Sequence, residues 1–252
     1  MLRSLYKIFF IGILLSLFPS WGRADPLPNI TAQAWLIADV NGNILQGSNT
    51  TDVRSIASIT KLMTVMVVID AQQDLNEVVT KKLFNKNLTR MDLIDLAIVK
   101  SDNEASKILC DKYPGGYKSC VQAMNDKARG LQMYNTSFTD PTGRMHDNVS
   151  TAQDLIKLVI ASSSYQVIVD ASKKDHLSYS TGKRNSIVFN NTNNLVGKGY
   201  DFIVTKTGFI NKAGGCIVFM IDTVRGVRTV IVLGSKNTRT RIPEAFLLST
   251  LY

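Results

Sequence analysis

Three short segments of this 252-residue chain carry residues that could do chemistry together. They are Ser58-Ile59-Thr60-Lys61, Ser101-Asp102-Asn103 and Lys206-Thr207-Gly208. The first offers a hydroxyl nucleophile and an amine that can accept its proton, because residues three apart on a helix are surface neighbours. The second offers groups for proton transfer and hydrogen bonding, and the third places a cation beside a hydroxyl and a glycine. Together they predict acyl transfer through a serine ester, on a substrate that carries a carboxylate.

Each motif alone is weak evidence. The S-x-x-K spacing begins at Ser4, Ser58 and Ser180, and S-x-N also occurs at Ser235-Lys236-Asn237. A Ser-Asp-Asn cluster is most often a helix cap or a turn, and a lysine on an edge strand can simply protect the sheet edge. Only Ser58 opens an apolar helical segment, and K-T-G occurs once, inside an apolar strand pattern. Because all three motifs stand in the right order and context, the chemical interpretation is favoured.

Helical patterns surround the first two motifs. Residues 56–71 are apolar nearly all round, as in a helix buried in a core. Burial there would lower the pKa of Lys61 and let the neutral amine act as a base. Further helices are predicted over roughly 90–131, 151–162 and 243–251.

The strand patterns lie near the two ends of the chain, with a hairpin turn at Asn41-Gly42-Asn43 and another at Arg225-Gly226. The predicted strands are 34–40, 44–46, 203–209, 216–222 and 229–233. The last two should pair as antiparallel neighbours. We therefore expect the α+β class, with one antiparallel sheet built from both termini and the active site between it and a helical subregion of about 85–165.

The first 24 residues predict a secretory signal peptide. Arg3 and Lys7 form its basic start, residues 8–18 form an apolar run, and Gly22-Arg23-Ala24 ends in small residues suited to cleavage. An uncleaved anchor is the alternative, but the run is shorter than the ~20 apolar residues that span a bilayer. We expect one catalytic domain over residues 25–252.

The composition is that of an exported, basic, globular protein. Hydrophobic residues make up 45% of the chain, enough for a sizeable core. Three of the 29 basic residues and none of the 20 acidic ones lie in residues 1–24, so the remainder carries +6. That charge could favour an anionic envelope polymer or lipid, or could be a merely soluble surface. No motif or dense basic run points to nucleic acid.

Three cysteines raise the question of a disulfide, which an exported chain can keep. Cys110 and Cys120 flank the turn-rich segment Tyr113-Pro114-Gly115-Gly116, so a bridge and two free thiols are both open. Cys216 lies in an apolar strand pattern and is expected to be a buried thiol. No His/Cys spacing indicates zinc, and no metal or cofactor is expected.

The set S-x-x-K, S-D-N and K-T-G is the signature of penicillin-binding proteins and class A β-lactamases. The chain resembles low-molecular-mass penicillin-binding proteins of the D-alanyl-D-alanine carboxypeptidase/endopeptidase family, and is similar to the penicillin-binding protein 7 type of endopeptidase. That implies the β-lactamase/transpeptidase-like fold. The matching segments are Ser55 to Thr64, Tyr113-Pro114-Gly115-Gly116, Asp140-Pro141-Thr142-Gly143, Asn191-Thr192-Asn193 and Lys206-Thr207-Gly208-Phe209.

This resemblance implies a role for each residue of the first two motifs. Ser58 would be the acylated nucleophile and Lys61 its general base. Ser101 would relay a proton between Lys61, Lys206 and the leaving amine. Asn103 would hydrogen-bond the acyl-side amide of the bound peptide, whereas Asp102 receives no role.

The resemblance also implies how the carboxylate side is held. Lys206 and Thr207 would bind the substrate carboxylate, and Gly208 would leave room for the substrate backbone. The N–H of the nucleophile and that of Phe209 would form the oxyanion hole. Ile210 stands where the family usually has threonine, which affects only details of the carboxylate-side contacts.

Two absences narrow the activity. Fast deacylation in class A β-lactamases uses a glutamate acting through a water. Glu77, Glu104 and Glu244 are the three glutamates, none within E-x-x-L-N, so we expect a lasting penicilloyl adduct. The chain ends about 45 residues after Lys206. That leaves no room for the additional C-terminal β-domain and amphipathic anchor of the major carboxypeptidases.

The favoured interpretation is a periplasmic DD-endopeptidase that cuts peptidoglycan cross-links. A DD-carboxypeptidase that trims the terminal D-alanine, a cell-wall-binding protein with vestigial catalysis, and a β-lactamase are the alternatives. The expected partners are peptidoglycan peptides and, as covalent inhibitors, β-lactams. We expect a monomer without nucleic acid and, after signal cleavage, without a transmembrane anchor.

Overall fold

The computed structural model describes residues 30–81, 83–180 and 186–251. The predicted signal peptide therefore lies outside the described residues, as does Lys183 of the third S-x-x-K match. Within the described part, no single helix is long and apolar enough to cross a membrane. Only the helices α5 (Ala152–Ser163) and α6 (Gln166–Lys173) taken together, at a bend of 97°, meet the requirement of length and composition.

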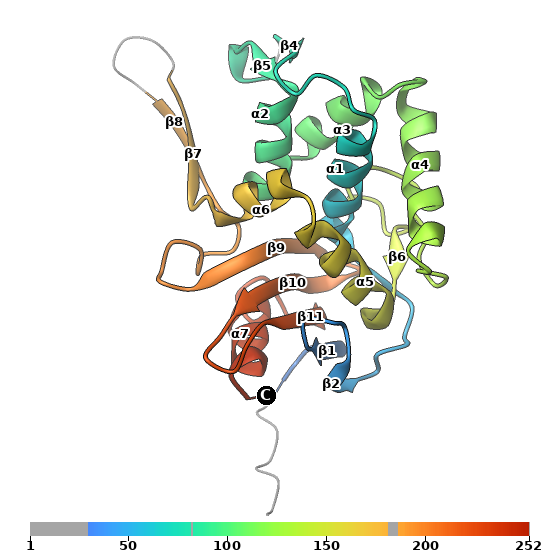
Figure 1. The fold of residues 1–252 in the computed structure, drawn as a ribbon, viewed down its shortest axis with the longest axis vertical. Helices are drawn as coiled ribbons and strands as arrows, with labels where there is room; N and C mark the ends of the chain where they lie inside the picture. The colour runs from blue at the N-terminus through green and yellow to red at the C-terminus, as the bar shows by residue number, and fades with distance from the viewer. Residues whose placement is uncertain (1–29, 82, 181–185, 252) are drawn as a thin grey trace, which may run out of the picture.

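A five-stranded antiparallel sheet forms one layer, in the order β2-β1-β11-β10-β9 (Figure 1). Its strands are β1 (Ala34–Ala38), β2 (Ile44–Ser48), β9 (Asp201–Ile210), β10 (Gly214–Asp222) and β11 (Arg228–Ser235). Both ends of the chain thus contribute to one sheet, as the sequence predicted. The strand that carries Lys206-Thr207-Gly208 is an edge strand, so its outer side is free to meet the helical region.

The sheet is covered on both faces, which explains the continuous apolar runs of its central strands. Side chains of β10 alternate between two cores. Val218 lies in the larger core with α1 and α5, whereas Ile217 and Phe219 lie in the smaller core under α7 (Arg241–Leu251). This period of two is what a pleated strand imposes.

The helical region lies against the edge strand β9 and the face opposite α7 (Figure 1). Its helices are α1 (Thr60–Asp70), α2 (Arg90–Asp95), α3 (Asn103–Asp111), α4 (Gly116–Gly130), α5 (Ala152–Ser163) and α6 (Gln166–Lys173). Helix α1 is buried over nearly its whole length, as its apolar sequence predicted. Helix α6 was not predicted, and it extends the helical region beyond the expected limit at residue 165.

Short elements complete the fold. The two-residue strands β3 (Arg54–Ser55) and β6 (Val149–Ser150) pair, as do β4 (Val78–Thr80) and β5 (Leu88–Thr89). A hairpin of β7 (His176–Ser180) and β8 (Ser186–Asn190), also not predicted, extends away from the body (Figure 1). The short elements η1 (Ala57–Ile59) and η2 (Leu83–Asn85) are 3₁₀ turns, and η3 (Leu96–Lys100) is a π-helical turn.

Two of the three cysteines form a disulfide, and the third is a free thiol. A disulfide joins Cys110, near the end of α3, to Cys120 in α4, with the two Cα atoms 5.3 Å apart. Cys216 is a free, buried thiol, and burial raises its pKa to about 11. The bridge therefore confirms one of the two alternatives, and Cys216 is the buried thiol that was expected.

Candidate active site

Ser58 lies at a sharp entry into the buried helix. The predicted helix over 56–71 begins later than expected, because Ala57 takes a left-handed backbone conformation (φ 47°) and residues 57–59 form the 3₁₀ turn η1. Thr60 Oγ1 donates a 2.8 Å hydrogen bond to the Ala57 carbonyl and so supports this turn. Ser58 stays half-buried between buried neighbours, which leaves its hydroxyl accessible at the start of α1.

Lys61 is placed to take the proton of that hydroxyl. Its Nζ lies 2.7 Å from Ser58 Oγ, 2.8 Å from Asn103 Oδ1 and 2.6 Å from the Thr142 carbonyl oxygen. Burial lowers the pKa of Lys61 to about 7, against the opposing charges of Asp140 and Asp102. A lysine with its pKa lowered in this way is readily neutral near neutral pH, and a neutral amine can act as a general base.

Ser101 connects a second buried lysine to the site. Lys206 Nζ donates to Ser101 Oγ at 2.7 Å and to the Thr207 carbonyl at 3.0 Å. Burial, and after it the charges of Lys61 and Arg241, hold the pKa of Lys206 well below its ordinary value. The hydroxyl of Ser101 therefore stands next to a group that can exchange a proton with it.

The backbone around Ser101 explains the second motif. Ser101 has a left-handed conformation (φ 60°) at the end of η3. Asp102 then caps α3, because its Oδ1 accepts the Ala105 N–H at 2.9 Å while its Oδ2 pairs with Lys100 at 2.8 Å. The residue to which the sequence gave no role is thus the helix cap that fixes Asn103 at the first position of α3.

Strand β9 passes directly over the nucleophile. A Cβ added to Gly208 would lie 2.8 Å from the Ser58 backbone nitrogen, so a side chain larger than hydrogen would force the strand away. Thr207 is buried and Phe209 is exposed. Gly208 thereby brings the backbone of β9 against the N–H of Ser58, which is where the two proposed oxyanion donors have to meet.

Arg241, at the start of α7, was not found from the sequence. Its Nη1 donates to the Gly208 carbonyl at 2.6 Å, and the side chain is buried. Arg241 therefore places a guanidinium group beside the K-T-G strand, a setting that favours a substrate carboxylate. Nothing in the sequence indicated this role, because Arg241 stands in no recognised motif.

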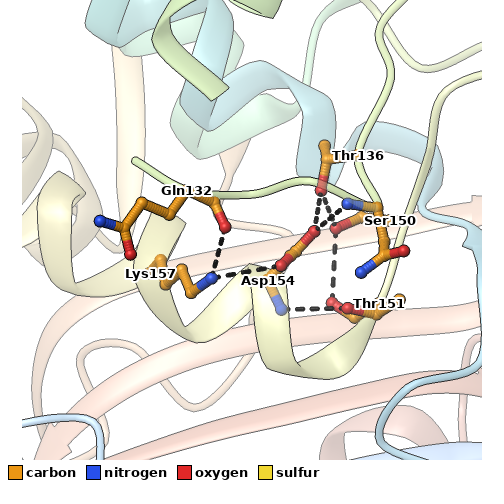
Figure 2. A network of polar contacts seen from close by, with 7 residues as sticks. Gln132, Thr136, Ser150, Thr151, Asp154 and Lys157 are labelled. Carbon is orange, nitrogen blue, oxygen red and sulfur yellow. Dashed lines mark hydrogen bonds and ion pairs between the residues drawn. The ribbon is translucent and has the colours of Figure 1, made fainter. Parts of the chain in front are cut away.

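The segment of residues 134–150 supplies the Thr142 carbonyl to Lys61, and Asp154 hydrogen-bonds to residues near its start (Figure 2). Asp154 Oδ2 accepts the Asn135 N–H at 2.8 Å and the Thr136 hydroxyl at 2.9 Å. Thr136 Oγ1 also lies 2.7 Å from Ser150 Oγ, and Thr151 caps α5 through the Asp154 N–H. Both ends of the segment are therefore tied to α5, while its middle supplies the Thr142 carbonyl to Lys61.

Comparison with known proteins identifies the family. Residues 22–237 match the family described as D-alanyl-D-alanine carboxypeptidase. The chain belongs to that family. It is 38% identical over 241 residues to the D-alanyl-D-alanine endopeptidase of Escherichia coli, covering 88% of this chain and 77% of the relative. It is 37% identical over 227 residues to the D-alanyl-D-alanine endopeptidase of Pseudomonas aeruginosa, covering 83% and 73%.

Solved structures agree with the sequence relatives. Penicillin-binding protein D2 of Listeria monocytogenes in its ampicillin-bound form superposes with a TM-score of 0.79 at 25% identity, covering 90% of this chain and 98% of that one. The predicted family and the α+β, transpeptidase-like fold are confirmed. This member of the D-alanyl-D-alanine carboxypeptidase family is a serine-type peptidase and hence a hydrolase.

Two of the three glutamates of this family member make contacts with residues outside the three motifs, and the third, Glu104, lines a small cavity with Asn103, Asp140 and Thr142. Glu77 pairs with Arg90, and Glu244 accepts hydrogen bonds from Thr31 and Ser235 under α7. Glu104 is exposed in the first turn of α3. Within the described residues, no group of three or more His, Cys, Asp and Glu side chains is placed to hold a metal ion.

Proposed function

We propose that the protein is a DD-endopeptidase that cuts D-alanyl cross-links between peptidoglycan stem peptides through an acyl-enzyme on Ser58. The observation that carries this proposal is the 2.7 Å contact between Ser58 Oγ and the buried Lys61 amine, whose pKa of about 7 suits a base. The two relatives named above, both called D-alanyl-D-alanine endopeptidases, support the choice of bond.

The first half of the reaction forms an ester. Lys61 takes the hydroxyl proton as Ser58 Oγ attacks the carbonyl carbon of the D-alanyl residue. The N–H groups of Ser58 and Phe209 would stabilise the oxyanion, an effect for which one donor is typically worth about 10²–10³ in rate. Asn103 would hold the acyl-side amide.

The second half releases both products. When the carbon–nitrogen bond breaks, the leaving amine takes a proton that Ser101 relays from the protonated Lys61. Lys61, neutral again, then takes one proton from a water that attacks the ester and passes this proton to Ser58 Oγ as the ester breaks. The second water proton leaves with the carboxylic acid product and is lost to solvent, so a free carboxylate and the original enzyme, with neutral Lys61, result. Lys206 and Thr207, with Gly208 giving room, would hold the carboxylate next to the cut amide.

A DD-carboxypeptidase is the second candidate, because the matching family carries that description and the same site would cut either bond. The two activities differ in the leaving group, which is a whole stem peptide in one and a single D-alanine in the other. Incubating purified cross-linked muropeptide dimers and a free pentapeptide side by side separates them. We expect the dimers to be cut faster, and a preference for the pentapeptide would favour the carboxypeptidase.

Labelled penicillin tests the chemistry. Intact-mass analysis should show one penicilloyl adduct, on Ser58, that persists because none of the three glutamates stands in the E-x-x-L-N context of the fast-deacylating enzymes. Ser58→Ala should abolish labelling. Ser180→Ala, at the other described S-x-x-K serine, is the matched control and should label normally. Labelling that survives Ser58→Ala would contradict the mechanism.

We further infer export and cleavage after Ala24, which leaves a single catalytic domain of residues 25–252 as a periplasmic monomer that β-lactams inhibit covalently. The basic, apolar and small-residue order of residues 1–24 supports this inference. Fractionation and N-terminal sequencing of the native protein check it. A full-length chain retained in the membrane would contradict it.

A further inference from the structure

One segment that contacts the general base has no side chain in the mechanism above. Residues 139–148 hydrogen-bond to Lys61 through the Thr142 carbonyl. The orientation of that carbonyl is set by Asp140. Its Oδ1 accepts the Thr142 N–H at 2.6 Å, the Thr142 hydroxyl at 2.6 Å and the Gly143 N–H at 2.9 Å. One carboxylate oxygen therefore closes the turn that presents the carbonyl to Lys61.

The Thr142 carbonyl helps to determine which way the lone pair of the neutral Lys61 amine points. An uncharged lysine has two N–H bonds and one lone pair. The Asn103 Oδ1 atom and the Thr142 oxygen can only accept, so they occupy the two N–H bonds of Lys61. The lone pair is then left for the hydroxyl of Ser58. Without the carbonyl, the amine could rotate and turn an N–H toward the nucleophile instead.

The second oxygen of Asp140 is also unusual. Asp140 is only 7% exposed, and its Oδ2 atom has no hydrogen-bond partner within the described part of the chain. A buried carboxylate oxygen without such a partner is costly unless a cation compensates it. The side chains that line the small cavity beside Asp140 include Asn103, Tyr117 and Arg144.

Several charged groups face Lys61 from the elements packed around it. Asp140 comes from the 139–148 segment, Asp102 from the cap of α3 and Lys206 from β9. Of the groups that raise the pKa of Lys61, Asp140 is the stronger and Asp102 the weaker. The charge that Lys61 gains when it takes the serine proton is therefore met first by Asp140.

We propose that Asp140 is a positioning residue for the acylation of Ser58, which holds the Thr142 carbonyl on Lys61 and stabilises the positive charge that forms there. The proposal rests on the proposed function, because it concerns how the base of that reaction is oriented. It adds the segment 139–148 to the three motifs as a fourth part of the machinery. Asp140 acts through the Thr142 carbonyl and through its charge near Lys61.

Asp140→Asn tests the charge, and Asp154→Asn is the matched control. Both carboxylates are buried, Asp140 at 7% and Asp154 at 3% exposure. Each accepts a backbone N–H and a threonine hydroxyl from the segment of residues 134–150. Only Asp140 faces Lys61. The readout is the second-order rate of penicillin acylation between pH 5 and 9, per folded protein, with thermal unfolding measured in parallel.

We expect Asp140→Asn to lower the plateau rate about 10-fold, since a misplaced base costs up to about 10²-fold. Because the charge that favours protonated Lys61 is lost, the rising limb of the pH profile should move about 1 unit toward lower pH. Asp154→Asn should keep the wild-type position of the rising limb, because the charge it removes does not face Lys61, even though it lowers the unfolding temperature. An unshifted limb for Asp140→Asn, or an equal shift for Asp154→Asn, would overturn the proposal.

Thr142→Val tests the hold on the carbonyl, and it does so even if Asp140→Asn fails to fold. It removes one of the three hydrogen bonds to Asp140, together with the 3.0 Å hydrogen bond that the Thr142 hydroxyl accepts from the Arg144 N–H, and keeps the charge. We expect a rate about 3- to 10-fold lower with an unmoved limb. A wild-type rate in this variant would refute the positioning. Failure of the proposed function would instead be seen in the wild-type protein, as the absence of an adduct on Ser58.

Discussion

At the residue scale, the reactive groups stand on backbone that most sequences avoid. Ala57 and Ser101 have left-handed conformations next to the nucleophile and at the relay serine, and Gly143 has a φ of 70°. Such conformations cost of order 1–3 kcal/mol in a residue with a side chain and persist only where neighbours enforce them. Here the neighbours are specific, since Asn148 donates to both Thr60 Oγ1 and the Asp140 carbonyl.

Gly143→Ala should damage the protein through its contact with the nucleophile turn. A Cβ at this position would lie 1.9 Å from the Ala57 carbonyl oxygen, and the backbone is left-handed. We expect a loss of about 2–4 kcal/mol in the free energy of unfolding, measured in urea, and slower acylation of Ser58. Gly130→Ala in α4 is the control, because a Cβ there meets nothing within 4 Å. A harmless Gly143→Ala would show that the turn is not tightly enclosed.

The sequence predicted the reactive side chains but not what surrounds them. The hydroxyl, the two lysines and Asn103 could be named because their types and spacing imply chemistry. The Thr142 carbonyl could not, because a main-chain oxygen leaves no signal in the residue type. Arg241 was missed because its contact with Gly208 depends on how α7 packs against the sheet.

At the element scale, prediction succeeded where burial imposes a clear pattern. Strands β9, β10 and β11 and the buried helix α1 have long apolar runs, so their existence followed from the sequence. Helix α6 and the β7–β8 hairpin did not. The strand β8 alternates between exposed and half-buried residues and belongs to an isolated pair, so its alternation is weak and its position depends on packing against η3.

The disulfide is a brace between two elements of the site. Helix α3 begins at Asn103, whose Oδ1 accepts from Lys61, and the bond at Cys110 ties its far end to α4. For a link between residues ten apart, the lost entropy of the unfolded chain corresponds to about 2–3 kcal/mol.

Replacing both cysteines by alanine, Cys110→Ala with Cys120→Ala, should therefore lower the free energy of unfolding by about 2–3 kcal/mol. Urea unfolding with and without reductant measures it. The wild-type protein should lose stability on reduction, whereas the double variant should not respond. A wild-type protein that is equally stable in both conditions would contradict the brace.

At the scale of the whole molecule, the site lies where the sheet edge meets the helical region, and it therefore buries two lysines. Lys61 and Lys206 are at most 1% exposed. Burial is the largest cause that lowers the pKa of each. Burying the two lysines lowers the free energy of unfolding at neutral pH, but it provides amines that can exchange protons. Active sites commonly combine lower stability with function in this way.

This burial predicts how stability varies with pH. The pKa of Lys61 is about 7 in the folded protein and near 10.5 when unfolded, so between these values the unfolded chain binds more protons. The free energy of unfolding should therefore rise with pH across that window, by at most about 1.4 kcal/mol per unit for one lysine, and Lys206 acts in the same direction. Lys61→Met removes one contribution, so urea unfolding should find the variant gaining on the wild type as pH falls from 10 toward 7. Lys118→Met, at an exposed position of α4, controls for the loss of one lysine. A gap between Lys61→Met and wild type that stays constant over this window would show that Lys61 is not held neutral by burial.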